Sequence, residues 1–115
     1  MNRDSYQDML NAVQAFHDKH DFKNTGGEEL AYRVALMAEE LGEISNCVTK
    51  GKDKSELAEE VADLFILLIG TAIAADFDLN NAFWHKMDKI MPVSYTHLRA
   101  HETLISISYA VFCLK

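Results

Sequence analysis

The chain has 115 residues, which supports one domain with a modest hydrophobic core. Hydrophobic residues make up 49% and charged residues 25%, as in an ordinary globular protein. The net charge of -7 argues against a nucleic-acid-binding surface. Cys47 and Cys113 give neither a disulfide framework nor metal-ligand spacing, so we expect a reduced, cytoplasmic setting.

Membrane segments are not expected either. Residues 1–8 are polar and acidic, unlike a signal peptide. The longest apolar run, residues 64–75, is too short to span a bilayer and is interrupted by Gly70 and Thr71. It is typical of a helix buried on most sides. In so small a protein, this predicts a subunit interface, and thus a homodimer or a homotetramer.

The sequence predicts four helices. Ser5 with Asp8 starts the first, which reaches about residue 20, and residues 21–27 form a loop. His17 and His20 are expected to be partly exposed groups at the helix end rather than metal ligands. The remaining helices and their predicted caps are residues 25–49 (Thr25 with Glu28), residues 54–75 (Asp53 with Glu56) and a helix beginning after Asp78.

A seven-residue pattern occurs twice, at residues 38–44 and 58–64. In each copy the order is small, acid, acid, branched apolar, small, acid, branched apolar. Acids three positions apart share one face of a helix, so Glu40 pairs with Glu43 and Glu60 with Asp63. Asp63 is also the only charge between residues 61 and 75, which is unusual for a solvated surface group.

Apolar residues spaced by threes and fours predict a buried stripe beside each acidic pair. The predicted stripes are Leu30, Val34, Met37, Leu41, Ile44 and Val48 in the second helix, and Leu57, Val61, Leu64 and Leu68 in the third. The short connection between these helices predicts an antiparallel hairpin. The four paired carboxylates would then face one another.

Such a cluster would repel itself unless it bound protons or a cation. Oxygen-only ligands favour magnesium, with manganese possible. A single acidic pair is usually a solvated helix face, but two matched copies on adjacent helices favour a metal site. Glu39 and Glu59 are weaker candidates, because they lie further round each helix.

The acidic motifs, Glu39 to Glu43 followed by Glu60 to Asp63, resemble those of the MazG-like nucleoside triphosphate pyrophosphohydrolases. The similarity extends over about residues 30–91. It implies an all-α fold, a four-helix bundle with a central antiparallel hairpin. It also implies hydrolysis of a nucleoside triphosphate to the monophosphate and pyrophosphate, as in house-cleaning of non-canonical nucleotides. One motif carboxylate, with Glu39 as a candidate, would take the proton from the attacking water.

Basic and aromatic residues supply candidate substrate contacts. The resemblance implies that Lys86 and, less directly, Lys89 contact the phosphates. Trp84 would stack on a base or simply pack. Lys52 and Lys54, in the connection, would reach the polyphosphate or only make the loop soluble.

After Met91 the chain departs from the family, whose members continue with a basic segment. Residues 92–115 resemble translated adapter or vector read-through at the end of a metagenomic reading frame. We therefore expect a helical domain at residues 1–91 and a non-native tail, with a genuine C-terminal strand as the alternative. If the tail is foreign, the native C-terminus is missing.

Three alternatives to the general enzyme remain open. A dedicated dCTP or dUTP hydrolase, or a phosphoribosyl-ATP pyrophosphohydrolase, would share this architecture. A non-catalytic helical dimerisation module would need no metal. A di-iron carboxylate bundle is disfavoured, because it uses Glu-x-x-His pairs and this chain has Glu43 and Asp63 at those positions.

Overall fold

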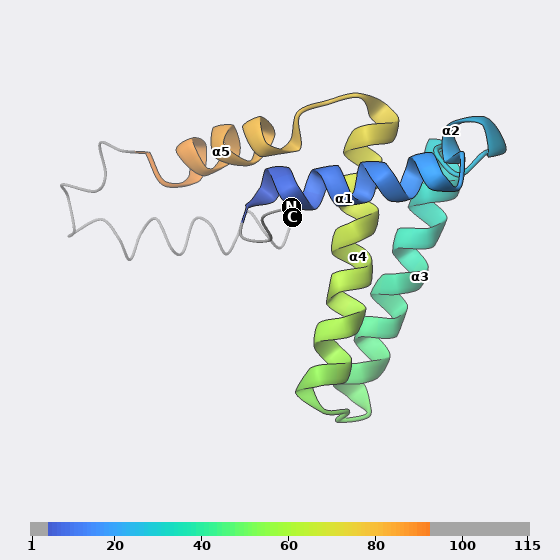
Figure 1. The fold of residues 1–115 in the computed structure, drawn as a ribbon. Coiled ribbons are helices and arrows are strands. Elements are labelled where there is room, and N and C mark those ends of the chain that lie inside the picture. The colour runs from blue at the N-terminus through green and yellow to red at the C-terminus, as the bar shows by residue number, and fades with distance from the viewer. Residues whose placement is uncertain (1–4, 93–115) are drawn as a thin grey trace. The chain divides into compact units, whose positions relative to one another are not determined.

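The structure, a computed structural model, describes residues 5–92, which are almost entirely helical. Its helices are α1 (Tyr6–Lys19), α2 (Phe22–Thr25), α3 (Leu30–Thr49), α4 (Lys54–Ala75) and α5 (Leu79–Ile90) (Figure 1). No strand occurs within residues 5–92, so the all-α prediction is confirmed. The chain divides into two compact units at Phe77 and Asp78, and α5 is therefore described by itself.

Three of the predicted helix starts are confirmed by their caps. The side chains of Ser5, Asp53 and Asp78 each accept a hydrogen bond from the backbone N–H three residues later. These bonds satisfy amide groups that the first turn of a helix leaves without a partner. Local chemistry is therefore enough to set the beginnings of α1, α4 and α5.

The predicted start of the second long helix was wrong. Glu29, not Thr25, caps α3, since its carboxylate accepts hydrogen bonds from the amides of Ala31 and Tyr32. Thr25 instead ends α2, a four-residue helix within the predicted loop, and its hydroxyl donates to the carbonyl of Asp21 at 2.8 Å. Glu28, the glutamate expected in the capping box, instead contacts His17 of α1.

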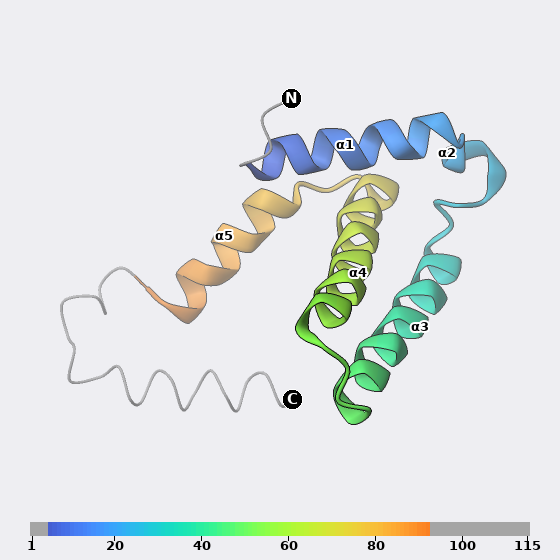
Figure 2. The ribbon, with the colours of Figure 1, turned by 60° about the horizontal axis from the view of Figure 1, so that its bottom comes forward.

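Helices α3 and α4 form the predicted antiparallel hairpin and lie side by side in both views (Figures 1 and 2). The connection is only Lys50–Asp53, and Gly51 takes the left-handed conformation there, with φ of 63°. At the opposite end of the hairpin, α1 crosses α4 and contacts it. The hairpin is thus closed at one end by a tight turn and covered at the other by α1.

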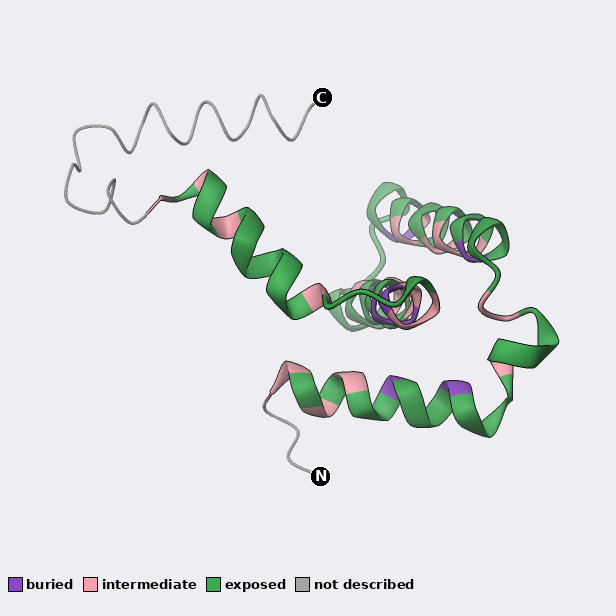
Figure 3. Ribbon diagram, turned by 90° about the horizontal axis from the view of Figure 1, so that it is seen from above, coloured by how far each residue is buried: buried purple, intermediate pink, exposed green. Residues whose placement is uncertain are grey.

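The buried part of the described chain is small and lies at the contacts of α1, α3 and α4 (Figure 3). Its apolar members are Val13, Cys47, Ile69 and Ala72. The predicted burial of the stripe along the second helix was largely wrong within this one chain. Four of its members are 47–64% exposed, namely Leu30, Val34, Leu41 and Val48.

The reason is a rotation of the face that meets the neighbouring helix. The more buried positions of α3 include two members of the predicted stripe, Met37 and Ile44, together with Arg33, Glu40 and Cys47 beside it. On α4, Leu57 and Leu64 are half-buried as expected, whereas Val61 and Leu68 are 47% and 44% exposed. The hairpin therefore closes on a mixed row that includes Arg33 and Glu40, and leaves an apolar face open.

Two further predictions concern the C-terminal tail and membrane-spanning segments. Apart from Pro92, the predicted tail at residues 92–115 lies outside the described residues. Across residues 5–92, no helix combines the length and apolar character needed to cross a membrane.

Candidate metal centre

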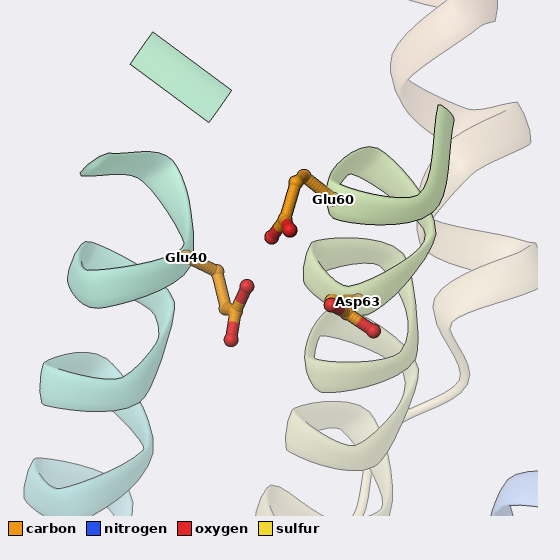
Figure 4. Close-up of side chains that lie close together, drawn as sticks. All are labelled: Glu40, Glu60 and Asp63. Carbon is orange, nitrogen blue, oxygen red and sulfur yellow. The ribbon is translucent and has the colours of Figure 1, made fainter. Parts of the chain in front are cut away.

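The hairpin brings together carboxylates from both acidic motifs. Glu40 projects from α3 toward Glu60 and Asp63 on α4 (Figure 4). One oxygen atom from each residue lies within 4.8 Å of the others. Glu60 and Asp63 share a face because they are three positions apart on one helix, and the antiparallel pairing supplies Glu40 from the other side. This convergence is the geometry expected for groups that could share one cation.

The negative charges of the cluster disfavour the ionised form of Glu40. Its pKa is raised, first by burial and then by the charges of Asp63 and Glu60, a hydrogen bond with Glu60 and the charge of Glu43. The Oε2 atom of Glu40 is buried and has no hydrogen-bond partner among the residues that the structure describes. A buried, unpartnered carboxylate oxygen beside two more carboxylates fits a hard divalent cation, because such ions take oxygen ligands.

The other carboxylates of the motifs lie outside this group of three. Glu43 is exposed, although its charge reaches Glu40. Glu39 and Glu59 are exposed as well.

The candidate substrate-binding residues fall in two places. Lys52 lies in the connection between α3 and α4, and Lys54 is the first residue of α4; both are exposed. Trp84, Lys86 and Lys89 are on α5, and Trp84 is 57% exposed with its ring edge-on to Phe83. Since α5 belongs to the second unit, the roles of its residues remain predictions.

A largely apolar cavity of about 620 Å³ adjoins the carboxylates. It is formed between α1 and the hairpin, with Glu40 and Asp63 among the residues that line it. Aromatic and aliphatic side chains provide most of its walls, including Phe16, Phe65 and Ile66. The cavity is of a size that accommodates a small molecule, and it places such a molecule against the acidic group.

Two functional-site neighbours were missed in the sequence. Arg33 is 3% exposed, and its guanidinium donates hydrogen bonds to α4 and to the carbonyl of Gly27. His17, expected to be partly exposed, is also only 3% exposed, since it packs against Gly70 and the ring of Phe22; its Nδ1 atom lies 2.9 Å from Oε2 of Glu28. The signal available for Arg33 was its position, two helical turns before Glu40 on the same face.

The fold and the site define the class of this protein: an all-α helical hairpin with a candidate carboxylate metal centre. The family model of the MazG nucleotide pyrophosphohydrolase domain matches residues 29–94, more than half of the chain. The chain therefore belongs to the MazG nucleotide pyrophosphohydrolase family, whose members generally use a divalent metal. Comparisons with curated proteins and with solved structures give no match.

Proposed function

We propose that the chain is a magnesium-dependent nucleoside triphosphate pyrophosphohydrolase, which converts a nucleoside or deoxynucleoside triphosphate to its monophosphate and pyrophosphate. The observation that carries the proposal is the convergence of Glu40, Glu60 and Asp63 within a MazG domain. Oxygen-only ligands favour magnesium, and manganese would be an acceptable substitute.

Glu40, Glu60 and Asp63 would hold the metal, with Glu43 as a fourth ligand if its side chain turned inward. A bound magnesium ion supplies charge neutralisation for the phosphates and lowers the pKa of a coordinated water. Glu39 is our candidate to accept the proton as water adds to phosphorus. The anhydride bond then breaks and pyrophosphate leaves.

Positive and aromatic residues would bind the rest of the nucleotide. Lys52 and Lys54 lie at the turn of the hairpin, and we assign them to the polyphosphate or the departing pyrophosphate. On α5, Lys86 and Lys89 are proposed phosphate contacts, and Trp84 a stacking surface for the base.

The cavity beside the acidic group favours a nucleotide over a simple polyphosphate. Its walls are mainly apolar, with Phe16 and Phe65 among them, and Glu40 and Asp63 border it. A substrate that fits such a surface has a ring system joined to an anionic chain. A nucleoside triphosphate has both parts, which supports the proposed substrate class.

We further propose that the protein works as a homodimer or a homotetramer. The apolar face left open on α3 includes Val34, Leu41 and Val48, each about 60% exposed or more in a single chain. Contiguous exposed apolar residues usually mark an interface. A monomeric mass in sedimentation at micromolar concentration would contradict this assembly.

A cytoplasmic location and the absence of a nucleic-acid partner complete the proposal. Cys47 is a buried free thiol, in keeping with a reducing compartment. The net charge of -7 disfavours binding to a polyanion.

The test is a panel of canonical and damaged nucleoside triphosphates with magnesium, assayed for pyrophosphate. Preference for damaged nucleotides would support a house-cleaning role. Strong preference for dCTP, dUTP or phosphoribosyl-ATP would identify a dedicated enzyme instead. Release of inorganic phosphate alone, or no turnover together with no thermal response to magnesium, would overturn the proposed function and favour a non-catalytic helical module.

Glu60→Gln is the matched site variant. We expect a folded protein whose turnover falls at least about a hundredfold, the scale of losing an electrostatic catalytic group. Glu56→Gln is the control, because Glu56 is exposed one turn earlier on α4 and lies outside the group of three. Equal turnover in a folded Glu60→Gln protein would remove Glu60 from the site.

A further inference from the structure

Arg33 is a buried cation that forms no ion pair within residues 5–92. Its three hydrogen bonds go to neutral acceptors: Nε to Oγ1 of Thr71 at 3.1 Å, Nη1 to the carbonyl of Gly27 at 2.9 Å, and Nη2 to the carbonyl of Leu67 at 3.0 Å. Burial lowers the pKa of the guanidinium, and the negative charge of Glu28 opposes that shift. A cation is expensive to bury, so the observed arrangement calls for a structural reason.

The residues that join Arg33 to α4 lie in the same helical register as the carboxylates. Arg33 lies seven residues before Glu40 on α3, and Leu67 lies seven residues after Glu60 on α4. Seven residues are nearly two complete turns, so each residue shares a face with its counterpart on the same helix. Because α3 and α4 are antiparallel, the Arg33–Leu67 contact and the Glu40–Glu60 contact are two levels of one interface, about 10 Å apart along the helices.

The guanidinium opposes both kinds of relative motion between the helices. A one-residue slide of α4 along α3 moves it by about 1.5 Å and would misalign the bonds to Leu67 and Thr71 together. A rotation of α4 would carry Thr71 away from Nε. The planar fork of arginine is suited to this role, because its donors are fixed relative to one another.

The surroundings of Arg33 hold the guanidinium in place. The carbonyl of Leu67 also accepts a hydrogen bond from the hydroxyl of Thr71 at 2.7 Å, so both acceptors on α4 are fixed by each other. At Gly70, a Cβ atom would collide with Nη2 of Arg33 and lie 2.6 Å from Nε2 of His17. Helix α4 can therefore approach this closely only because position 70 has no side chain.

We propose that Arg33 is a positioning residue for the metal centre, which sets the register of α3 against α4 so that Glu40 meets Glu60 and Asp63. The proposal rests on the proposed function, since it assumes that these carboxylates bind a divalent metal. Arg33 itself touches neither metal nor substrate.

The experiment measures Mn²⁺ affinity of the full chain without nucleotide, by electron paramagnetic resonance of free Mn²⁺. Arg33→Lys keeps the charge but loses the fork, and we expect its dissociation constant for Mn²⁺ to rise about tenfold or more, as for other groups that orient metal ligands. Thr71→Val removes one acceptor at nearly constant volume and should have a smaller effect in the same direction. Thr71→Ser keeps the hydroxyl and should retain the wild-type affinity.

The control separates register from general stability. Ala72→Gly weakens the same stretch of α4, because it lowers helix propensity and removes a buried methyl group, but it leaves every acceptor of Arg33 in place. We expect a lower melting temperature with Mn²⁺ affinity within about twofold of wild type. Loss of affinity in Ala72→Gly that matches Arg33→Lys at equal loss of melting temperature would overturn the positioning role.

The remaining outcomes distinguish the two proposals. A wild-type chain that binds no Mn²⁺ overturns the proposed function and the role of Arg33 with it. A wild-type chain that binds Mn²⁺, with unchanged affinity in folded Arg33→Lys, overturns the role of Arg33 alone. If Arg33→Lys does not fold, Thr71→Val decides, and unchanged affinity in that variant likewise rejects the proposal.

Discussion

Replacing Glu40 with glutamine should stabilise the protein without metal and weaken its response to magnesium. Glu40 faces two carboxylates, with one oxygen from each residue within 4.8 Å of the others. At this separation two unit charges repel by about 0.9 kcal/mol in water and about 3.5 kcal/mol at an effective dielectric constant of 20. Asp63 is exposed, so the lower figure applies, and removing two repulsions raises the free energy of unfolding by about 1–2 kcal/mol.

Magnesium reverses the order of stability. A ligand bound only by the folded state at a hundred times its dissociation constant stabilises wild type by about 2.7 kcal/mol. Glu40→Gln has one anionic ligand fewer and should gain much less. In a domain of this size, 1 kcal/mol shifts the melting temperature by about 4–8 °C, so both effects are measurable.

The assay is thermal unfolding followed by circular dichroism, at neutral pH and low ionic strength, in EDTA and in saturating magnesium chloride. Glu56→Gln is the control and should stay within about 0.5 kcal/mol of wild type in both buffers. The reasoning is refuted if Glu40→Gln melts below wild type in EDTA and keeps the full magnesium response. Added sodium chloride should reduce the gain seen in EDTA, because salt screens the repulsion.

Three more predictions concern the close approach at Gly70, the pKa of Glu40 and the helix cap at Asp53. Gly70→Ala should destabilise the protein by about 1–3 kcal/mol in urea unfolding, because overpacking against Arg33 and His17 outweighs alanine's better helix propensity; a gain in stability would contradict that close approach. The raised pKa of Glu40 means that the free energy of unfolding of the metal-free protein falls as the pH rises above 4.5, whereas the melting temperature shift caused by magnesium grows. A metal-free protein that gains stability over this range, or a magnesium shift that shrinks, would contradict this. Asp53→Ala should lower the melting temperature at neutral pH and less so below pH 3.8, because the backbone hydrogen bond from Glu56 lowers the pKa of the Asp53 cap; an equal loss at both pH values would reject the ionised cap.

Local sequence signals predicted the starts of α1, α4 and α5, but not that of α3. Asp53 and Asp78 cap helices as expected, since a cap depends on groups only three residues apart. The Thr25 cap failed because Glu28, its expected partner, pairs with His17 on another helix. A capping box read from sequence cannot register such a distant competitor, and Glu29 provides the cap instead.

The convergence of carboxylates from the two helices was predicted from the same periodicity, and its role as a site stays a prediction. The two acidic motifs do converge, and Glu40 with Asp63 illustrates the pairing across the hairpin. Glu43 was predicted to face inward with Glu40, but it lies outside the group of three that the structure brings together. The hydrogen bonds of Arg33 could not be read from the sequence, since their acceptors on α4 are 34 and 38 positions away in the chain.

The short turn at Lys50–Asp53 and the guanidinium lie on opposite sides of the acidic group along the hairpin. If the contacts of Arg33 hold α3 and α4 in register from the end opposite the turn, the turn itself can change in length. Inserting a few flexible residues after Gly51 should then leave the three carboxylates opposite one another. The turn is accordingly the place where a reporter peptide or an additional recognition loop can be grafted without dismantling the metal centre.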